Sequence, residues 1–391
     1  MLNLLALAVL LLLLLLAAPA RAEEPGRAQE SGQRFPATPA PYTIALDLFA
    51  FTQVDQGGNP LVAEGFRYQA VGLELKGRLS EQVGLRATGV LAALNNDPLP
   101  SLPATIVNPN VTSASFDFTT LDATLSLDWT SADREWTVTP GFFYHHQWAY
   151  IAGGLDLEVR RVLAGGDAVL RASYSGRYAG LRQKHWDGAP VVDDVRLTHN
   201  AVLGWTQNLS PSLVVSAGLQ YTRQDGLLHS TLQFVALRDA TGAPVRLVDE
   251  VLPRVRNRVQ LNLRGRYTPL PGLGVGLDLA GYLDDWDLLN LAIEPSVETP
   301  LPDGMRLRAW YRLAGQNATR YFTTSPDPAQ RYRTQNASLG AFLLHGPGAT
   351  LLIPLAKAED PRWLLRVSVL GFHRSDEVFG VGGTMGVSAE W

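Results

Sequence analysis

Residues 379–391 read FGVGGTMGVSAEW and alternate strictly between two kinds of side chain. The odd positions, from Phe379 to Trp391, are apolar or small, and the even positions are small or polar. A period of two predicts a β-strand with one apolar face. This strand runs to the end of the sequence and finishes on an aromatic residue. We therefore expect it to close a barrel in lipid by pairing with the first strand, because a closed barrel has no unpaired edge. The alternative is an ordinary edge strand.

Segments with the same alternation recur from Tyr42 onward. Residues 121–130 are the clearest, with Leu125 and Trp129 on one face and Asp122 and Ser126 on the other. Many weak segments of roughly ten residues in series are typical of a transmembrane barrel. The sequence therefore predicts an all-β protein, a transmembrane antiparallel β-barrel of about 16 strands. The expected strands span residues 42–54, 66–79, 83–95, 112–130, 136–148, 149–162, 167–182, 194–208, 212–224, 254–268, 273–285, 288–299, 304–316, 333–346, 361–374 and 379–391.

Short and long connections alternate between these segments. Short turns such as 210–211 and 271–272 contain Pro, Gly, Ser or Asp, and the long connections are 96–111, 183–193, 225–253 and 319–331. Short turns at one end and long loops at the other are typical of outer-membrane barrels. We expect residues 345–361 to form a long turn or a short inward excursion. Residues 225–253 carry an apolar run that either folds inward and narrows the lumen or forms a surface hairpin.

Composition limits the class of protein. The chain has no cysteine, which excludes disulfides and thiolate metal sites, and its net charge of −4 gives no reason to expect nucleic acid as a partner. Residues 1–22 contain a short Leu-rich run and an Ala-Arg-Ala cleavage site, which predict a signal peptide, although Lys and Arg are missing before the run. Residues 23–41 predict a flexible leader, and residues 42–391 the barrel. We therefore expect a protein exported to the bacterial outer membrane, in contact with its lipid.

Arginines gather on one face of the segment 254–267. On a lipid-facing surface each would cost about 2–4 kcal/mol near the midplane, so we expect this face to point into the barrel. The next strands add three more arginines opposite an apolar face. The expected lumen arginines are Arg254, Arg256, Arg258, Arg264, Arg266, Arg306, Arg308 and Arg312.

Two interpretations of these arginines remain open. In the first, they line an aqueous pore and attract anionic solutes. In the second, they pair with carboxylates on adjacent strands and stiffen the wall. A turn about Pro271 places Arg264 opposite Asp278 and Arg258 opposite Asp284, and a turn at residues 302–303 places Glu298 opposite Arg306. The other five arginines have no such partner, and some of them are expected to face solute.

Motifs for catalysis are sparse. The chain has no G-x-S-x-G, and Ser173 and Ser175 fit lumen-facing hydroxyls. His145 and His146 are adjacent, so on a strand their rings point to opposite faces, which is poor geometry for a metal. His199 falls on an apolar face with no partner in view. We expect no enzyme, no cofactor and no metal site.

Two resemblances add to this interpretation. The C-terminal strand from Phe379 to Trp391 resembles the closing strand and assembly signal of bacterial outer-membrane β-barrels, which implies insertion by the barrel-assembly machinery. A second set of short motifs resembles the C-terminal part of a family of uncharacterised bacterial outer-membrane proteins of about 400 residues, and no activity can be carried over from it. These motifs are Trp310-Tyr311-Arg312, Gln316-Asn317-Ala318, Tyr321-Phe322, Tyr332-Arg333-Thr334 and Leu339-Gly340-Ala341-Phe342.

Three functional hypotheses follow. The first is a porin-like channel for small polar solutes, with an arginine-rich lumen that favours anionic ones. The second is a plugged barrel that serves a partner complex in structure or assembly. The third, the weakest, is a barrel enzyme. The sequence leaves open which solute passes, whether the lumen is open, and whether the protein forms a homo-oligomer, since lipid-facing and subunit-facing apolar residues look alike.

Overall fold

The computed structural model describes residues 42–56, 65–96, 118–182, 193–229, 234–239, 241, 244–326, 329–355 and 362–391. The expected signal peptide and leader, residues 1–41, lie outside these ranges. Among the described residues, no helix is both long and apolar enough to cross a membrane.

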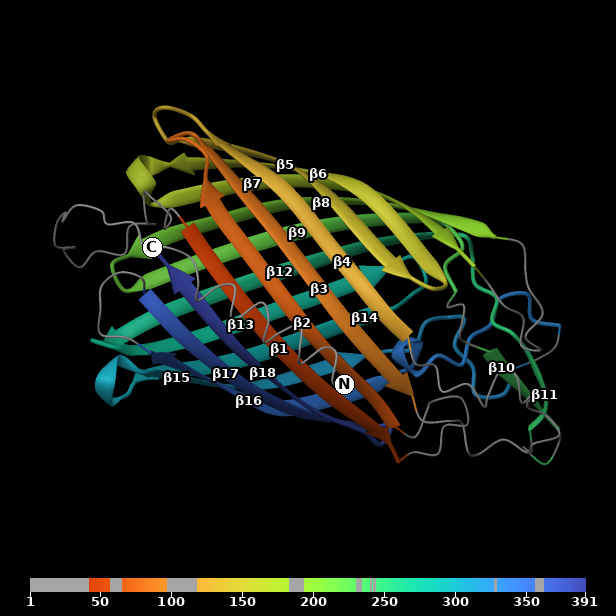
Figure 1. Cartoon of the computed structure of the whole chain (residues 1–391). Coiled ribbons are helices and arrows are strands. Elements are labelled where there is room, and N and C mark those ends of the chain that lie inside the picture. The colour runs from red at the N-terminus through yellow and green to blue at the C-terminus, as the bar shows by residue number, and fades with distance from the viewer. Residues whose placement is uncertain are drawn as a thin grey trace.

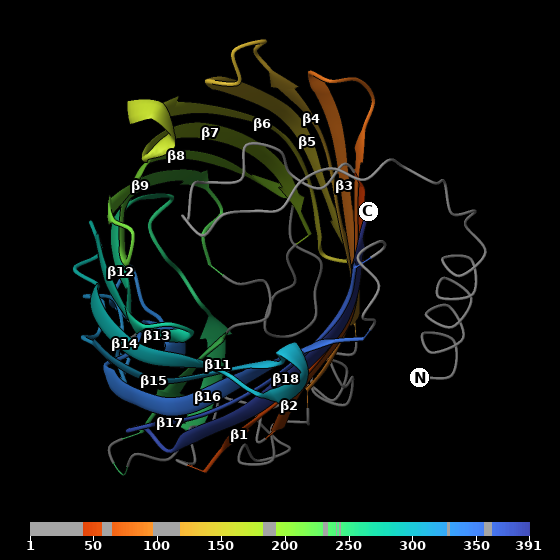
Figure 2. The same cartoon turned by 90° about the vertical axis from the view of Figure 1, so that its left-hand side faces the viewer.

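Sixteen antiparallel strands form one closed barrel, as the alternating sequence predicts (Figure 1). Figure 2 shows the strands arranged as a ring. Neighbours in the chain are neighbours in the sheet, except that β9 pairs with β12 because a separate two-stranded sheet, β10 and β11, lies between them in the sequence. The first eight barrel strands are β1 (Tyr42–Asp55), β2 (Gly65–Arg78), β3 (Val83–Asn96), β4 (Phe118–Thr130), β5 (Trp136–Gln147), β6 (Tyr150–Leu163), β7 (Ala168–Leu181) and β8 (Asp194–Ser210).

The second half of the chain holds the remaining strands. They are β9 (Leu213–Gly226), β10 (Phe234–Arg238), β11 (Pro244–Asp249), β12 (Val255–Leu270), β13 (Leu273–Asp284), β14 (Leu289–Pro300), β15 (Arg306–Gln316), β16 (Phe342–Pro354), β17 (Arg362–Arg374) and β18 (Val378–Glu390). Three short 3₁₀ turns are η1 (Ala164–Gly166), η2 (Pro302–Gly304) and η3 (Ala337–Leu339). Both ends of the barrel chain lie at the end that carries the short turns η1 and η2 (Figure 1).

The closing strand pairs as its pattern predicts. β18 joins β1 along its whole length, from Thr43 opposite Glu390 to Asp55 opposite Val378. The last residue continues the ladder: Tyr42 N–H donates to the Trp391 carbonyl at 3.1 Å, and Trp391 N–H donates to the Tyr42 carbonyl at 3.2 Å. The two rings stack with their centroids 5.9 Å apart. The sheet therefore has no free edge, as a membrane-spanning sheet requires.

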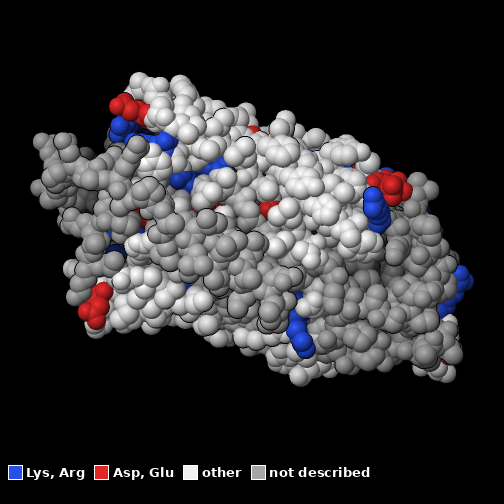
Figure 3. All heavy atoms as spheres, viewed as in Figure 1, with Lys and Arg blue, Asp and Glu red and all other residues white. Residues whose placement is uncertain are grey.

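The period of two divides the wall into an apolar outer face and a polar lumen face. On β12, Val255, Leu261 and Tyr267 point outward and stay exposed, while the even positions point into the lumen. Figure 3 shows uncharged side chains over much of the visible flank, with charged side chains mainly toward its two ends. An apolar belt of this kind matches a barrel that meets lipid on its outside.

One expected strand is placed wrongly. Of the fourteenth expected strand, 333–346, residues 333–341 belong to a long connection that runs from 317 to 341. The strand itself is β16, which begins nine residues later than expected. The residues expected to be a turn or inward excursion, 345–354, therefore lie in the wall. In addition, β4 begins at Phe118 in the described chain, and the expected start at residue 112 lies outside it.

Residues 345–354 were expected to form a turn because the run Gly346-Pro347-Gly348 has the composition of a loop. In the structure, the two glycines let β16 pack closely against its neighbouring strands. A Cβ atom on Gly348 would overlap the Trp310 ring on β15, and one on Gly346 would overlap the backbone of Gly371 on β17. The ladder between β16 and β17 is interrupted at Gly346 and Pro347, because proline has no N–H to donate.

This packing gives a first test. Gly346→Ala is expected to lower the free energy of unfolding by about 1–3 kcal/mol, because the backbone of Gly371 cannot give way as a flexible side chain can. Gly265→Ala is the matched control, since Gly265 also lies in a strand but has open space where its Cβ would be. Urea unfolding in lipid vesicles measures both variants. Equal stability of the two would contradict the assigned position of β16.

Candidate functional site

Charged side chains line the lumen face of the barrel wall from β12 to β15. Arg264 lies directly opposite Asp278, as the turn at Pro271 predicts, and its Nε donates to Oδ1 at 2.8 Å. Arg266 Nη2 donates to the other oxygen of Asp278 at 2.6 Å. Arg308 reaches Asp278 and Glu294 at 3.7 Å each, and Arg312 reaches Glu294 at 3.7 Å. Four arginines therefore share two carboxylates.

The two kinds of charge lie at different depths of this wall. The side chains of Asp278 and Glu294 are each 21% exposed, whereas Arg264 and Arg312 are 62% and 52% exposed. The short carboxylates thus stay against the strands, and the longer guanidinium groups extend into the lumen. With four positive charges over two negative ones, this part of the lumen presents an excess of positive charge to any solute.

The second predicted register is wrong by two residues. Glu298 lies opposite Arg308, and Arg306 lies opposite Pro300, because the turn between β14 and β15 includes η2 and is centred one residue later than expected. Arg306 Nη1 still reaches Glu298 at 3.6 Å across the diagonal of the ladder. The predicted ion pair of Arg306 with Glu298 is therefore present, but it is a long and exposed contact.

Arg254 forms an ion pair at the rim of the barrel. Its Nη1 and Nη2 donate to the two carboxylate oxygens of Asp194 at 2.6 and 2.8 Å. Asp194 begins β8, two strands away from β12, so a hairpin-by-hairpin search could not find it. This hydrogen bonding raises the pKa of Arg254 above its usual value and keeps it charged.

Arg256 is part of a buried ion pair and does not face solute. Its Nε donates to Asp284 Oδ2 at 2.8 Å, its guanidinium lies 4.2 Å from the Trp286 ring, and the Asp284 side chain is fully buried. Asp284 Oδ1 also accepts the backbone N–H groups of Trp286 and Leu288. Arg258 lies opposite Asp284 in the ladder, as predicted, but its Nη2 donates to Gln224.

These contacts correct one expectation. Five arginines were expected to lack a carboxylate, yet each of them has one: Arg254 with Asp194, Arg256 with Asp284, Arg266 with Asp278, and Arg308 and Arg312 with Glu294. Long side chains reach diagonal as well as directly opposed neighbours, which a simple register count leaves out.

Two long loops pack together at the other end of the barrel and form a cap, residues 234–239, 244–252, 317–326 and 329–340. Val235 and Thr334 are fully buried, and Ala236 N–H donates to Gln335 Oε1 at 2.8 Å. Val251 and Arg333 exchange backbone hydrogen bonds at 3.2 and 2.8 Å. Figure 1 places β10 and β11 beyond the strand ends, and Figure 2 shows β11 within the outline of the ring. The cap therefore lies across this mouth of the barrel.

Trp286 joins the cap to the wall. It is 2% exposed, it packs with Leu252 and Leu339, and its carbonyl accepts from Thr319 Oγ1 at 2.7 Å. Because Asp284 positions the Trp286 backbone, the buried ion pair of Arg256 and Asp284 supports the cap. The sequence showed the charges but not this role, since Trp286 and its partner Thr319 in the cap lie 33 residues apart.

His145 and His199 each contact a side chain of a neighbouring strand. His145 points into the lumen and its Nδ1 lies 2.7 Å from Asp122. His199 has a partner after all, on the outer face: Tyr174 Oη lies 2.7 Å from its Nδ1. Within the described ranges, no group of three or more His, Asp or Glu side chains is arranged to hold a metal ion.

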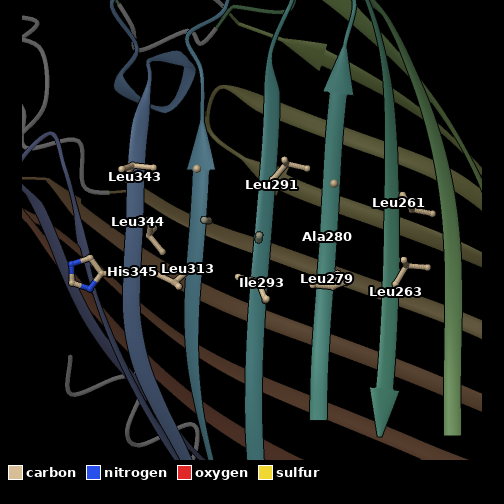
Figure 4. Close-up of a pocket in the computed structure, with 14 residues that line it drawn as sticks. Leu261, Leu263, Leu279, Ala280, Leu291, Ile293, Leu313, Leu343, Leu344 and His345 are labelled. Atoms are coloured by element: carbon tan, nitrogen blue, oxygen red, sulfur yellow. The ribbon is translucent and has the colours of Figure 1, made fainter.

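The outer wall carries an apolar groove of about 660 Å³ across β12 to β16 (Figure 4). Its walls are leucines such as Leu261, Leu291 and Leu343, and Gly281 and Gly315 leave space between them. His345 stands at its edge, with Nδ1 2.8 Å from Tyr311 Oη. The groove faces the lipid side of the wall, so it belongs to the membrane surface of the barrel and not to the lumen.

Several residues of the lumen wall were missed from the sequence. Glu294 is the most important, because it accepts two arginines. The alternation of β14 does place it on the lumen face, and the register seen between Glu298 and Arg308 continues to Glu294 and Arg312, so a turn placed correctly would have found it. Arg160 and Arg171 lie on other strands and show no clustering in the sequence.

Comparison with known proteins places the chain in a family. The family described as "Protein of unknown function (DUF3570)" matches residues 108–338, which is more than half of the chain. No curated protein matches the sequence.

Three solved structures are similar to this chain at low sequence identity. A "Bacterial polysaccharide outer membrane secretin" is 9% identical with a TM-score of 0.49, and the alignment covers 89% of this chain and 98% of that one. CdiB from Acinetobacter baumannii is 10% identical with a TM-score of 0.47, covering 88% of this chain and 60% of that one. Pseudomonas aeruginosa OpdK with vanillate is 10% identical with a TM-score of 0.43, covering 90% and 98%.

The buried ion pair gives a second test. Asp284→Asn leaves Arg256 buried without a counter-charge, so the free energy of unfolding should fall by about 3–5 kcal/mol. Asp287→Asn is the matched control, because the ion pair of Asp287 with Arg320 is exposed and should be worth less than about 1 kcal/mol. Urea unfolding measures both. A cost for Asp284→Asn no larger than that of the control would refute a supporting role.

Proposed function

We propose that this chain, which belongs to the family described as Protein of unknown function (DUF3570), is a porin-like channel of the bacterial outer membrane for small polar solutes, with a preference for anions. One observation carries the proposal: the guanidinium groups of Arg264 and Arg312 extend into the lumen, while the carboxylates that neutralise them, Asp278 and Glu294, stay in the wall. Charged rings and walls of this kind set the selectivity of pores.

The size of the barrel supports an aqueous lumen. Barrels of 16 to 18 strands leave a channel wide enough for water, whereas barrels of about eight strands are filled by their own side chains. This barrel has sixteen strands, and its lumen face is polar along β12 to β15. The Leu-rich run of residues 4–16 and the closing strand support export and insertion by the barrel-assembly machinery.

A second candidate function rests on the cap. A mouth covered by packed loops favours a barrel that is closed to solute and serves a partner complex instead. Val235, Leu247 and Trp286 are buried in or beneath these loops, so the cap has a small core of its own. Neither candidate involves an enzymatic step, and either one is compatible with a homo-oligomer.

Conductance separates the two candidates. We expect the refolded protein in a planar bilayer to give stable single-channel steps, with a reversal potential in a salt gradient that indicates anion preference. In the double variant Arg264→Gln/Arg312→Gln, the ratio of anion to cation permeability should fall at least about twofold, because the exposed positive charge is removed. Arg306→Gln, at the short-turn rim, is the comparison for a loosely paired arginine.

A folded protein without conductance would refute the channel and support the plugged barrel. Folding is checked independently by the heat-dependent mobility of the barrel in gel electrophoresis. Conductance steps without anion preference would refute the role given to the lumen arginines, and so would a preference that is unchanged in the double variant. Either result would still support a channel.

A further inference from the structure

Two arginines face each other across β6 and β7 on the lumen side. Arg160 lies directly opposite Arg171 in the ladder. Like charges in this position repel and destabilise a sheet unless something neutralises them. Arg171 has a counter-charge, since its Nη2 lies 2.6 Å from Glu158. The guanidinium group of Arg160 makes no hydrogen bond or ion pair with any residue that the structure describes. The pair therefore presents uncompensated positive charge to the lumen.

Both arginines line a recess of about 560 Å³ in the lumen wall. Arg264 and Arg312 line it as well, from β12 and β15. The recess exists because small residues lie in register between these arginines: Gly204 is opposite Gly218, and Ala280 is opposite Ala292. Its volume is within the range of pockets that hold small-molecule ligands.

The charges around the recess do not cancel. Four arginines and two carboxylates, Asp278 and Glu294, line it. Those carboxylates also neutralise Arg266 and Arg308, so they have no capacity left for Arg160. Thr206 and Ser216 add hydroxyl groups, joined by a hydrogen bond of 3.1 Å, and each hydroxyl can also hydrogen-bond to an oxygen atom of a ligand.

We propose that this recess binds a small oxyanion, a carboxylate or a phosphate, held by Arg160 and Arg171 with Arg264 and Arg312 nearby. The planar guanidinium group binds both of these anions through two parallel hydrogen bonds. The anion supplies the negative charge that Arg160 lacks. This inference rests on the proposed function, because the recess is reached from lumen water, and it extends that function by naming the class of solute.

Calorimetric titration of the full chain in detergent micelles at low ionic strength tests the proposal, with benzoate and inorganic phosphate as separate probes. We expect binding of at least one probe, weakened about tenfold in Arg160→Gln. The matched control is Arg161→Gln, which removes the same charge from the outer face, where Arg161 lies over the Trp136 ring at 4.7 Å. If Arg160→Gln does not fold, Arg264→Gln carries the same expectation.

Binding of benzoate alone assigns the recess to organic carboxylates, binding of phosphate alone assigns it to phosphates, and binding of both assigns it to oxyanions in general. Absence of binding, or equal weakening in Arg160→Gln and Arg161→Gln, would overturn the proposal. Because calorimetry needs no conduction, the two proposals fail separately. Conductance without binding overturns only the recess, and binding without conductance overturns only the channel.

Discussion

Closure of the sheet by hydrogen bonds between β1 and β18 is the constraint on which the other features of this protein depend. In lipid an unpaired backbone N–H or carbonyl costs several kcal/mol, so a sheet that spans a membrane cannot have an edge. Closure brings Tyr42 and Trp391 together, and it makes the number of strands even when both termini lie at one end. It also gives every strand one face toward lipid and one toward the lumen. The charged side chains therefore gather inside.

Inside the barrel, the lengths of the side chains decide which charges extend into the lumen. Asp and Glu are short and stay against the strands, whereas Arg reaches past them into the lumen. Paired charges such as Arg264 and Asp278 thus stabilise the wall and still present positive charge to the lumen. Arg256 differs because its partner Asp284 is fully buried beneath the cap, where the pair supports the loops. Neighbouring arginines on one strand therefore have different roles, which are set by the depth of their carboxylates.

Much of this fold could be predicted from the sequence, because alternation, turn residues and loop lengths are local signals. The strand number, the register across Pro271 and the pair of Arg264 with Asp278 followed directly from them. Arg258 lies opposite Asp284, as predicted, but its side chain donates to Gln224 instead. β16 could not be predicted, since Gly346, Pro347 and Gly348 resemble a loop until the Trp310 ring and the β17 backbone show why side chains are excluded there. Asp194 could not be found from the hairpins, because its partner Arg254 lies beside β12, two strands away from β8. Glu294 was missed because the turn between β14 and β15 is centred one residue later than expected.

Cysteine accessibility along β12 tests the central claim, a water-filled lumen lined by the arginine-bearing face, most directly. The chain contains no cysteine, so single substitutions give an unambiguous signal. In lipid vesicles, a charged, water-soluble thiol reagent should modify Gln260→Cys and Asn262→Cys, and should leave Leu261→Cys and Leu263→Cys unmodified. Alternating reactivity with a period of two is the result that the structure predicts. Modification of the leucine positions instead, or equal reactivity at all four, would contradict it.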